Sequence, residues 1–140
     1  MKGKIFTDTN ILIYSFGKSD IKKKNRCVDI IDRYDRDSQL VWSTQVMQEF
    51  YFTMTRKKGK DPLRVKSLLS YFDNFDLVIN NKEIIQKAIE LQVILKLSFW
   101  DCLILSSAIA SRCNYLLTED LHDGQMVEGL TIVNPFNSNV

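Results

Sequence analysis

Short apolar runs alternate along this chain with longer segments in which apolar residues recur about every 3.6 positions. The short runs are rich in β-branched and aromatic residues, which favour strands. They predict strands over residues 4–7, 40–43, 76–79, 115–118 and 131–133. The first helical segment lies between the first two strands and carries Val28, Ile31 and Tyr34. Because strands that alternate with helices indicate βαβ crossovers, we expect an α/β fold, a three-layer α/β/α sandwich around a mainly parallel sheet.

Capping residues set the boundaries of the later helices. A helix over residues 44–56 stops at Gly59, and Asp61 as N-cap with Pro62 at the first helical position opens another over 63–72. Asn81 caps a helix that runs to residue 95. The segment SFWDCLILSSAIASRC, which starts at Ser98, is apolar almost all round, so we expect its helix to be buried on most sides.

The composition limits the architecture to one domain. The chain has 140 residues, 45% of them hydrophobic, so we expect a single domain over residues 1–136 and a short tail over 137–140. No apolar run approaches the ~20 residues that cross a bilayer, and no secretory signal is apparent. We therefore expect a soluble cytoplasmic protein without a membrane partner. Three cysteines at spacings that match no zinc or CxxC motif are interpreted as buried hydrophobes.

A net charge of +2 conceals two basic clusters. One contains Lys22, Lys23, Lys24 and Arg26, and the other contains Arg56, Lys57, Lys58 and Lys60. Either cluster can meet phosphates, and either can be ordinary solvated surface. The charge balance alone does not identify a ligand.

Acidic residues follow two of the predicted strands. Asp8 comes directly after the first strand, and Glu119 and Asp120 follow the strand over 115–118. In open parallel sheets, ligands bind beyond the carboxyl ends of the strands. Glu49 and Asp101 lie on predicted helices, and they can reach the same edge if those helices begin there. The spacing alone does not establish this convergence.

Each of these acids also has a purely structural interpretation. Asp8 can cap a short helix that begins near Asn10, and Asp101 can form a variant capping box with Ser98. Glu49 can pair with a lysine or arginine nearby. Asp120 and Asp123 lie in LTEDLHDG, which is rich in turn formers.

Carboxylates that gather at one place repel each other unless a cation lies between them. Oxygen ligands select Mg²⁺ or Mn²⁺, and such an ion lowers the pKa of a bound water and neutralises charge on a phosphate. His122 is the only histidine, so a histidine acid–base pair is excluded. The sequence contains neither GxxxxGK[ST] nor GxGxxG, so no nucleotide-binding loop of those kinds is supported. These observations favour a metal-dependent phosphodiesterase.

Four motifs together resemble a known family. FTDTNILIY, STQVMQEF, SFWDCLILSSA and LLTEDLHDG, with the closing GLTIVNPF, are similar in kind and order to the PIN-domain ribonucleases. More narrowly, they resemble the VapC toxins of toxin–antitoxin modules. The resemblance covers nearly the whole chain.

The resemblance implies a Mg²⁺- or Mn²⁺-dependent endoribonuclease. The residues that would hold the metal or orient its water are Asp8, Glu49, Asp101 and Asp120. Those that would support them are Asn10, Thr118 and Ser43. The family pattern T-x-D selects Asp120, and Glu119 and Asp123 lie close enough in sequence to compete with it.

The resemblance also implies partners. A second copy of the chain would form a homodimer with the first. A VapB-like antitoxin would cover the acidic groove with its C-terminal segment, and a transfer or ribosomal RNA would be the substrate. The RNA would approach across the basic clusters, with Lys23, Lys24, Lys57 and Lys58 as contacts.

Two alternatives remain open from the sequence. Another Mg²⁺-dependent phosphoryl-transfer fold, such as a receiver or a haloacid-dehalogenase-type phosphatase, also places an aspartate after its first strand. Asp8-Thr9-Asn10 lacks the second aspartate of a DxD motif. The other alternative is a non-catalytic module that binds RNA or protein.

Overall fold

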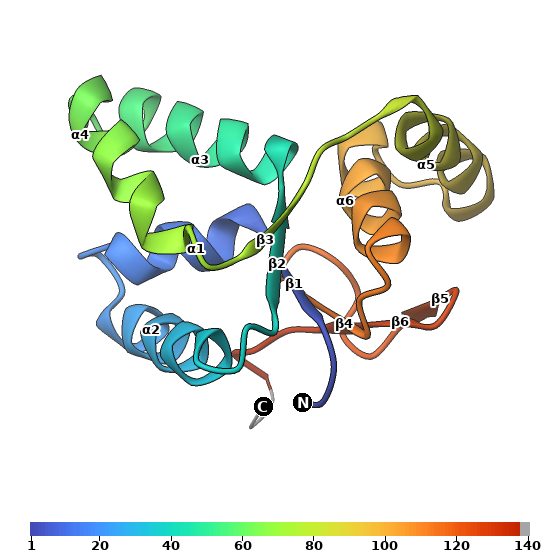
Figure 1. Ribbon diagram of the computed structural model, residues 1–140, viewed down its shortest axis with the longest axis horizontal. Coiled ribbons are helices and arrows are strands. Elements are labelled where there is room, and N and C mark those ends of the chain that lie inside the picture. The colour runs from blue at the N-terminus through green and yellow to red at the C-terminus, as the bar shows by residue number, and fades with distance from the viewer. Residues whose placement is uncertain (138–140) are drawn as a thin grey trace.

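The structure is a computed structural model that describes residues 1–137 (Figure 1). The tail expected over 137–140 therefore falls almost entirely outside the described residues. A six-stranded sheet runs through the centre in the order β3-β2-β1-β4-β6-β5. Its strands are β1 (Ile5–Thr7), β2 (Leu40–Ser43), β3 (Asp76–Val78), β4 (Tyr115–Leu117), β5 (Met126–Val127) and β6 (Leu130–Val133). All neighbouring strands are parallel except β5 and β6.

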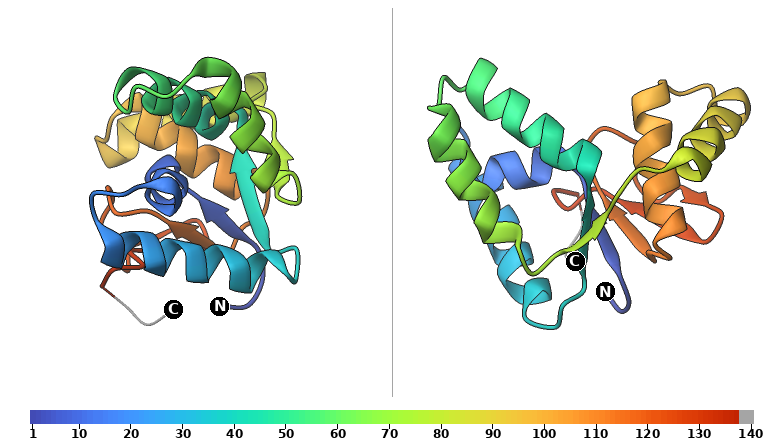
Figure 2. Two further views of the ribbon diagram at one scale, coloured as in Figure 1. Left: turned by 90° about the vertical axis from the view of Figure 1, so that its left-hand side faces the viewer. Right: turned by 45° about the horizontal axis from the view of Figure 1, so that its top comes forward.

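Helices cover both faces of this sheet. The bounds are α1 (Thr9–Phe16), α2 (Ile21–Asp35), α3 (Thr44–Arg56), α4 (Pro62–Leu68), the 3₁₀ helix η1 (Leu69–Phe72), α5 (Lys82–Leu95) and α6 (Phe99–Ala110). In Figures 1 and 2, α1 to α4 lie on one side of the strands, and α5 and α6 pack together on the other. The predicted three-layer α/β/α sandwich is confirmed.

The core forms on both faces of the central strands. Ile5 and Phe6 in β1 and Leu116 and Leu117 in β4 have no exposed surface, as expected for strands buried on both sides. Each large apolar side chain buried this fully stabilises the fold by roughly 1.5–3 kcal/mol. On the α3 side, the ring of Phe72 packs against several other aromatic rings.

The structure differs from the sequence prediction in three places. The helix expected over 63–72 ends at Leu68 and tightens into η1, as often happens in the last turn of a helix. The short helix near Asn10, which the sequence suggests only through Asp8 as a possible cap, is the eight-residue helix α1. The strand β5 was not predicted because it has only two residues. Its turn to β6 uses positive φ at Glu128 and Gly129, which suits a two-residue hairpin but is a weaker sequence signal than Asn-Gly.

In residues 1–137, no single helix is long and apolar enough to cross a membrane; α5 and α6 satisfy those criteria only as a pair, across a bend of 120°.

Candidate active site

The carboxyl ends of β1, β2 and β4 meet at one edge of the sheet. The chain leaves β1 toward β2 on one side and later returns to β4 on the other, so β1 lies at a switch in strand order. Such a switch point opens a crevice where ligands bind in parallel α/β sheets. Asp8 follows β1, Ser43 ends β2, and Thr118 follows β4. The fold therefore brings three sequence-predicted residues to the same edge.

Asp8 is held in place from two directions. Its side chain caps α1 by accepting a hydrogen bond from the Thr9 amide at 2.7 Å, and its other oxygen accepts one from the Thr118 hydroxyl at 2.7 Å. Only 8% of Asp8 is exposed. The pKa of Asp8 is raised to about 7, chiefly by burial and in smaller part by the carboxylates of Asp120 and Glu49, against the lowering effect of the two hydrogen bonds. The structural and the functional interpretations of Asp8 thus hold together.

Glu49 and Asp120 each accept a hydrogen bond from α1. The Thr9 hydroxyl donates to Glu49 Oε1 at 3.2 Å, and Asn10 Nδ2 donates to Asp120 Oδ2 at 3.0 Å. Burial raises the pKa of both acids, and repulsion from Asp101 adds to this in each case. No ion pair of Glu49 with a lysine or arginine is present in residues 1–137.

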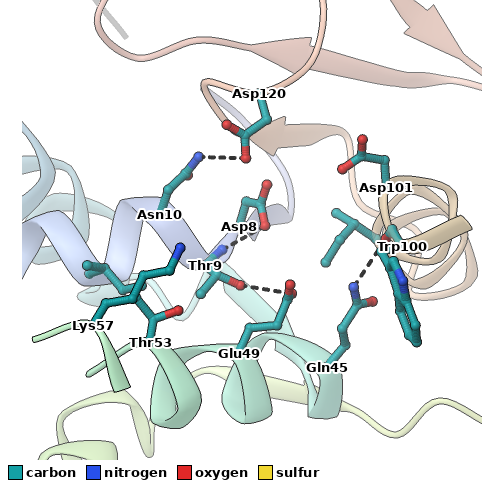
Figure 3. Close-up of a pocket in the computed structure, with 12 residues that line it drawn as sticks. Asp8, Thr9, Asn10, Gln45, Glu49, Thr53, Lys57, Trp100, Asp101 and Asp120 are labelled. Carbon is teal, nitrogen blue, oxygen red and sulfur yellow. Dashed lines mark hydrogen bonds between the residues drawn. The ribbon is translucent and has the colours of Figure 1, made fainter. Parts of the chain in front are cut away.

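Asp101 completes the set from the opposite side of the sheet. It lies in the first turn of α6, where its amide donates to Ser98 Oγ at 3.1 Å. Its carboxylate faces the other three acids across a pocket of about 290 Å³ (Figure 3). The structure thus brings Asp8, Glu49, Asp101 and Asp120 together in one pocket, with Asn10 on its wall.

Several pocket residues had not been singled out from the sequence. They include Thr9, Gln45, Thr53 and Trp100. Gln45, Glu49, Thr53 and Lys57 recur every four residues along α3, a spacing that places side chains on one helix face. This spacing predicts Gln45, Thr53 and Lys57 as site residues once Glu49 is assigned to the site.

The loop after β4 resolves the competition between its three acids. Asp120 lines the pocket, whereas Glu119 accepts a hydrogen bond from the Tyr14 hydroxyl and pairs with Lys23 Nζ at 2.9 Å. Asp123 accepts a hydrogen bond from the Asn134 amide at 2.8 Å and does not line the pocket. The geometry therefore favours Asp120 as the fourth acid.

Ser43 and the four lysines predicted to contact RNA differ in whether they line the pocket. Ser43 is fully buried and caps α3, with Val46 N donating to its hydroxyl, so it supports the helix rather than lining the pocket. Lys57 lines the acidic pocket. Lys58 lines a neighbouring pocket, whereas Lys23 packs over the rings of Tyr14 and Phe136 in addition to its ion pair. Lys24 is partly buried on α2 and lines neither pocket.

The donor set of the pocket fits a hard cation. Its lining offers carboxylate, hydroxyl and amide oxygens as ligands, and no histidine or cysteine is among the lining residues. Two further oxygens of lining residues, Asn10 Oδ1 and Gln45 Oε1, are buried without a hydrogen-bond partner in the described chain. No group of three or more His, Cys, Asp or Glu side chains within residues 1–137 is close enough to hold a metal directly. The separation of the four carboxylates is compatible with Mg²⁺, because this ion retains several of its waters in proteins.

Comparison with known proteins agrees with this geometry. The model of the PIN domain family matches residues 5–122, so the chain belongs to the PIN domain family. The predicted family resemblance is confirmed. No curated protein sequence matches the chain.

Several solved structures share the fold. A toxin–antitoxin complex from Klebsiella pneumoniae contains a chain that is 25% identical, with a TM-score of 0.70 over 95% of this chain and 98% of that one. VapC20 from Mycobacterium tuberculosis, a toxin that cleaves the sarcin-ricin loop, is 14% identical, with a TM-score of 0.67 over 81% of this chain and 87% of that one. FitAcB from Neisseria gonorrhoeae is 15% identical, with a TM-score of 0.69 over 96% and 99%.

Proposed function

We propose that this protein is a Mg²⁺- or Mn²⁺-dependent endoribonuclease and the toxin of a type II toxin–antitoxin system. The observation that carries the proposal is the convergence of four carboxylates on one pocket at the carboxyl edge of the sheet. Membership of the PIN domain family and the likeness to toxin structures support it. The sarcin-ricin loop cleavage by VapC20 supports a transfer or ribosomal RNA as substrate. Such a toxin acts in the cytoplasm, where it meets RNA.

The side chains of the pocket divide the work. Asp8, Asp101, Asp120 and Glu49 would hold the ion, in part through waters that it retains, or orient its water. The ion supplies activation of water and offsets negative charge on the phosphate. The Thr118 hydroxyl and the Thr9 amide fix the two oxygens of Asp8, and Asn10 fixes Asp120. Glu49, whose pKa is raised, is suited to accept a proton at Oε2 because Oε1 is held by Thr9. Lys57 supplies positive charge at the far wall for the phosphate.

Two surfaces suit the proposed protein partners. The groove between α3 and α4, about 580 Å³ in volume, is lined by apolar side chains that include Tyr51, Phe52 and Leu63. A concave apolar groove suits a segment of a VapB-like antitoxin. On the other side of the sheet, α5 exposes Ile89, Val93 and Ile94, and a helix face of this kind suits the isologous contact of a homodimer.

Cleavage of total cellular RNA by the purified protein tests the proposal. We expect discrete fragments with Mg²⁺ or Mn²⁺, and their loss with EDTA or in Asp8→Asn. Asparagine caps a helix as well as aspartate does, so this variant should fold. Asp73→Asn, an exposed acid on the α4 side, is the matched control and should cleave normally.

Intact RNA under every condition, from folded protein free of antitoxin, would favour the non-catalytic binding module instead. Labelling of Asp8 by acetyl phosphate would indicate a phosphoryl-transfer enzyme. Membership of the PIN domain family counts against this last alternative.

A further inference from the structure

A second pocket, of about 230 Å³, adjoins the candidate active site. It lies between the C-terminal end of α1 and the segment that follows α3. Ile13 lines both pockets, and Thr53 and Lys57 of the first are followed in the chain by Met54 and Lys58 of the second. The two pockets are therefore neighbours along α3.

The second pocket has the opposite charge to the first. Three lysines line it, and no acid does: Lys18, Lys58 and Lys60. None of the three forms an ion pair within residues 1–137, in contrast to Lys23 and Lys87. A ligand that spans both pockets would place a phosphate beside the carboxylates and another anionic group among the lysines. A polymer with regularly spaced phosphates meets this requirement.

Packed aromatic rings support the apolar part of the second pocket. The Phe16 ring packs edge-on against Phe50, Tyr71 and Phe72, with centroids 5.9, 5.5 and 5.9 Å away. Ile13 and the buried Met54 extend this surface. Nucleobases stack or pack on such surfaces with little dependence on sequence. A free phosphate or an acidic peptide would use the lysines without needing the apolar floor.

We propose that this second pocket binds the RNA nucleotide next to the scissile phosphate. Its base packs on the apolar floor formed by Ile13, Phe16 and Met54, and its phosphate lies among Lys18, Lys58 and Lys60. The inference rests on the proposed nuclease function, because that function places the scissile phosphate in the neighbouring acidic pocket.

Binding of a short fluorescent single-stranded RNA, measured by anisotropy with EDTA over a range of salt concentrations, tests the pocket without cleavage. Lys58→Ala/Lys60→Ala is compared with Lys2→Ala/Lys82→Ala, which removes the same charge at exposed positions away from both pockets. Each phosphate contact in a single strand contributes about 0.7 to the slope of log Kd against log salt. Since the proposed site holds one phosphate, we expect a slope lower by up to about 0.7 in the first variant and nearly unchanged in the second.

A series of RNA substrates of increasing length gives a second readout. The wild type should gain at least about fivefold in kcat/KM when the substrate acquires the nucleotide that reaches the lysines, because a stacked base contributes that much or more. The gain should be smaller in Lys58→Ala/Lys60→Ala, because the phosphate contact that holds the nucleotide over the apolar floor is weakened, and it should be unchanged in the control.

Equal salt slopes and equal length dependence in the two double variants would overturn the inference. So would lysine-dependent binding of a glutamate-rich peptide together with RNA binding that ignores the lysines. If the wild type cleaves no RNA but shows the lysine-dependent slope, the RNA-binding pocket stands and the nuclease function fails.

Discussion

Asp8 combines two tasks whose physical requirements conflict. As the N-cap of α1 it is favoured as an anion, because it accepts the Thr9 amide at the positive end of the helix. As a buried acid beside other carboxylates it is disfavoured as an anion, and its pKa rises to about 7. A cation in the pocket would remove the conflict, since it stabilises the charged form.

The conflict predicts an unusual dependence of stability on pH for the metal-free protein. Because the folded state holds the proton of Asp8 more tightly than the unfolded chain does, stability should fall as the pH rises from about 4 to about 7 and then level off. At pH 8 the cost approaches about 4 kcal/mol. Asp8→Asn should therefore be more stable than the wild type at pH 8 and similar at pH 4, as measured by urea unfolding in EDTA.

Addition of a metal ion tests whether a cation stabilises the charged form of Asp8. Mn²⁺ should raise the Tm of the wild type at pH 8 and change that of Asp8→Asn much less. Asp73→Asn should follow the wild type throughout. Parallel pH profiles for all three proteins would contradict the assignment of a raised pKa to Asp8.

At the scale of elements, the loop after β4 separates three acids that are close in sequence. Asp120 faces the pocket, Glu119 joins α1 and α2 to the loop through Tyr14 and Lys23, and Asp123 accepts the amide of Asn134 beyond β6. Glu119 and Asp123 therefore hold the loop in place, and Asp120 is free to act in the pocket.

Substitution of the three acids should separate these roles. Asp120→Asn should lower the cleavage rate by about 100-fold or more, as expected for a group that acts on the metal. Glu119→Gln should lower the Tm and lose less than about tenfold in rate, because it acts only by positioning the loop. Asp123→Asn should cleave nearly normally. A loss in Glu119→Gln equal to that in Asp120→Asn, with an unchanged Tm, would reverse the assignment.

The sequence predicted the elements with strong local signals. The helices that begin after Asp61, Asn81 and Ser98 were found because each of these residues caps its helix. Contacts between distant segments carried no such signal. The pairing of Lys23 with Glu119 spans 96 residues, so a lysine assigned to RNA from its neighbours in the chain already has a carboxylate partner in the fold.

At the scale of the whole molecule, α5 carries several exposed apolar side chains on the side of the sheet away from α3. Val93 is 74% exposed, Ile94 is 72% exposed and Ile89 is 50% exposed. Contiguous exposed apolar surface of this kind marks contact with another protein.

We expect the protein to be a homodimer through this helix. Val93→Glu/Ile94→Glu should shift the sedimentation of the purified protein from dimer to monomer, because charge cannot be buried unpaired in such a contact. Ser67→Glu/Ser70→Glu adds the same charge at exposed polar positions of α4 and η1, on the other side of the sheet, and should leave the dimer intact. A monomeric wild type, or equal behaviour of the two variants, would contradict the dimer.

The row of side chains along α3 also has a direction. From Glu49 to Lys57 the helix advances about 12 Å, and the character of the row changes from acidic to basic along it. An RNA strand that is cut beside Glu49 would therefore leave one fragment in contact with the lysines and the other without these basic contacts. The fragment in contact with the lysines would be expected to leave more slowly than the other one, and more slowly still at low salt.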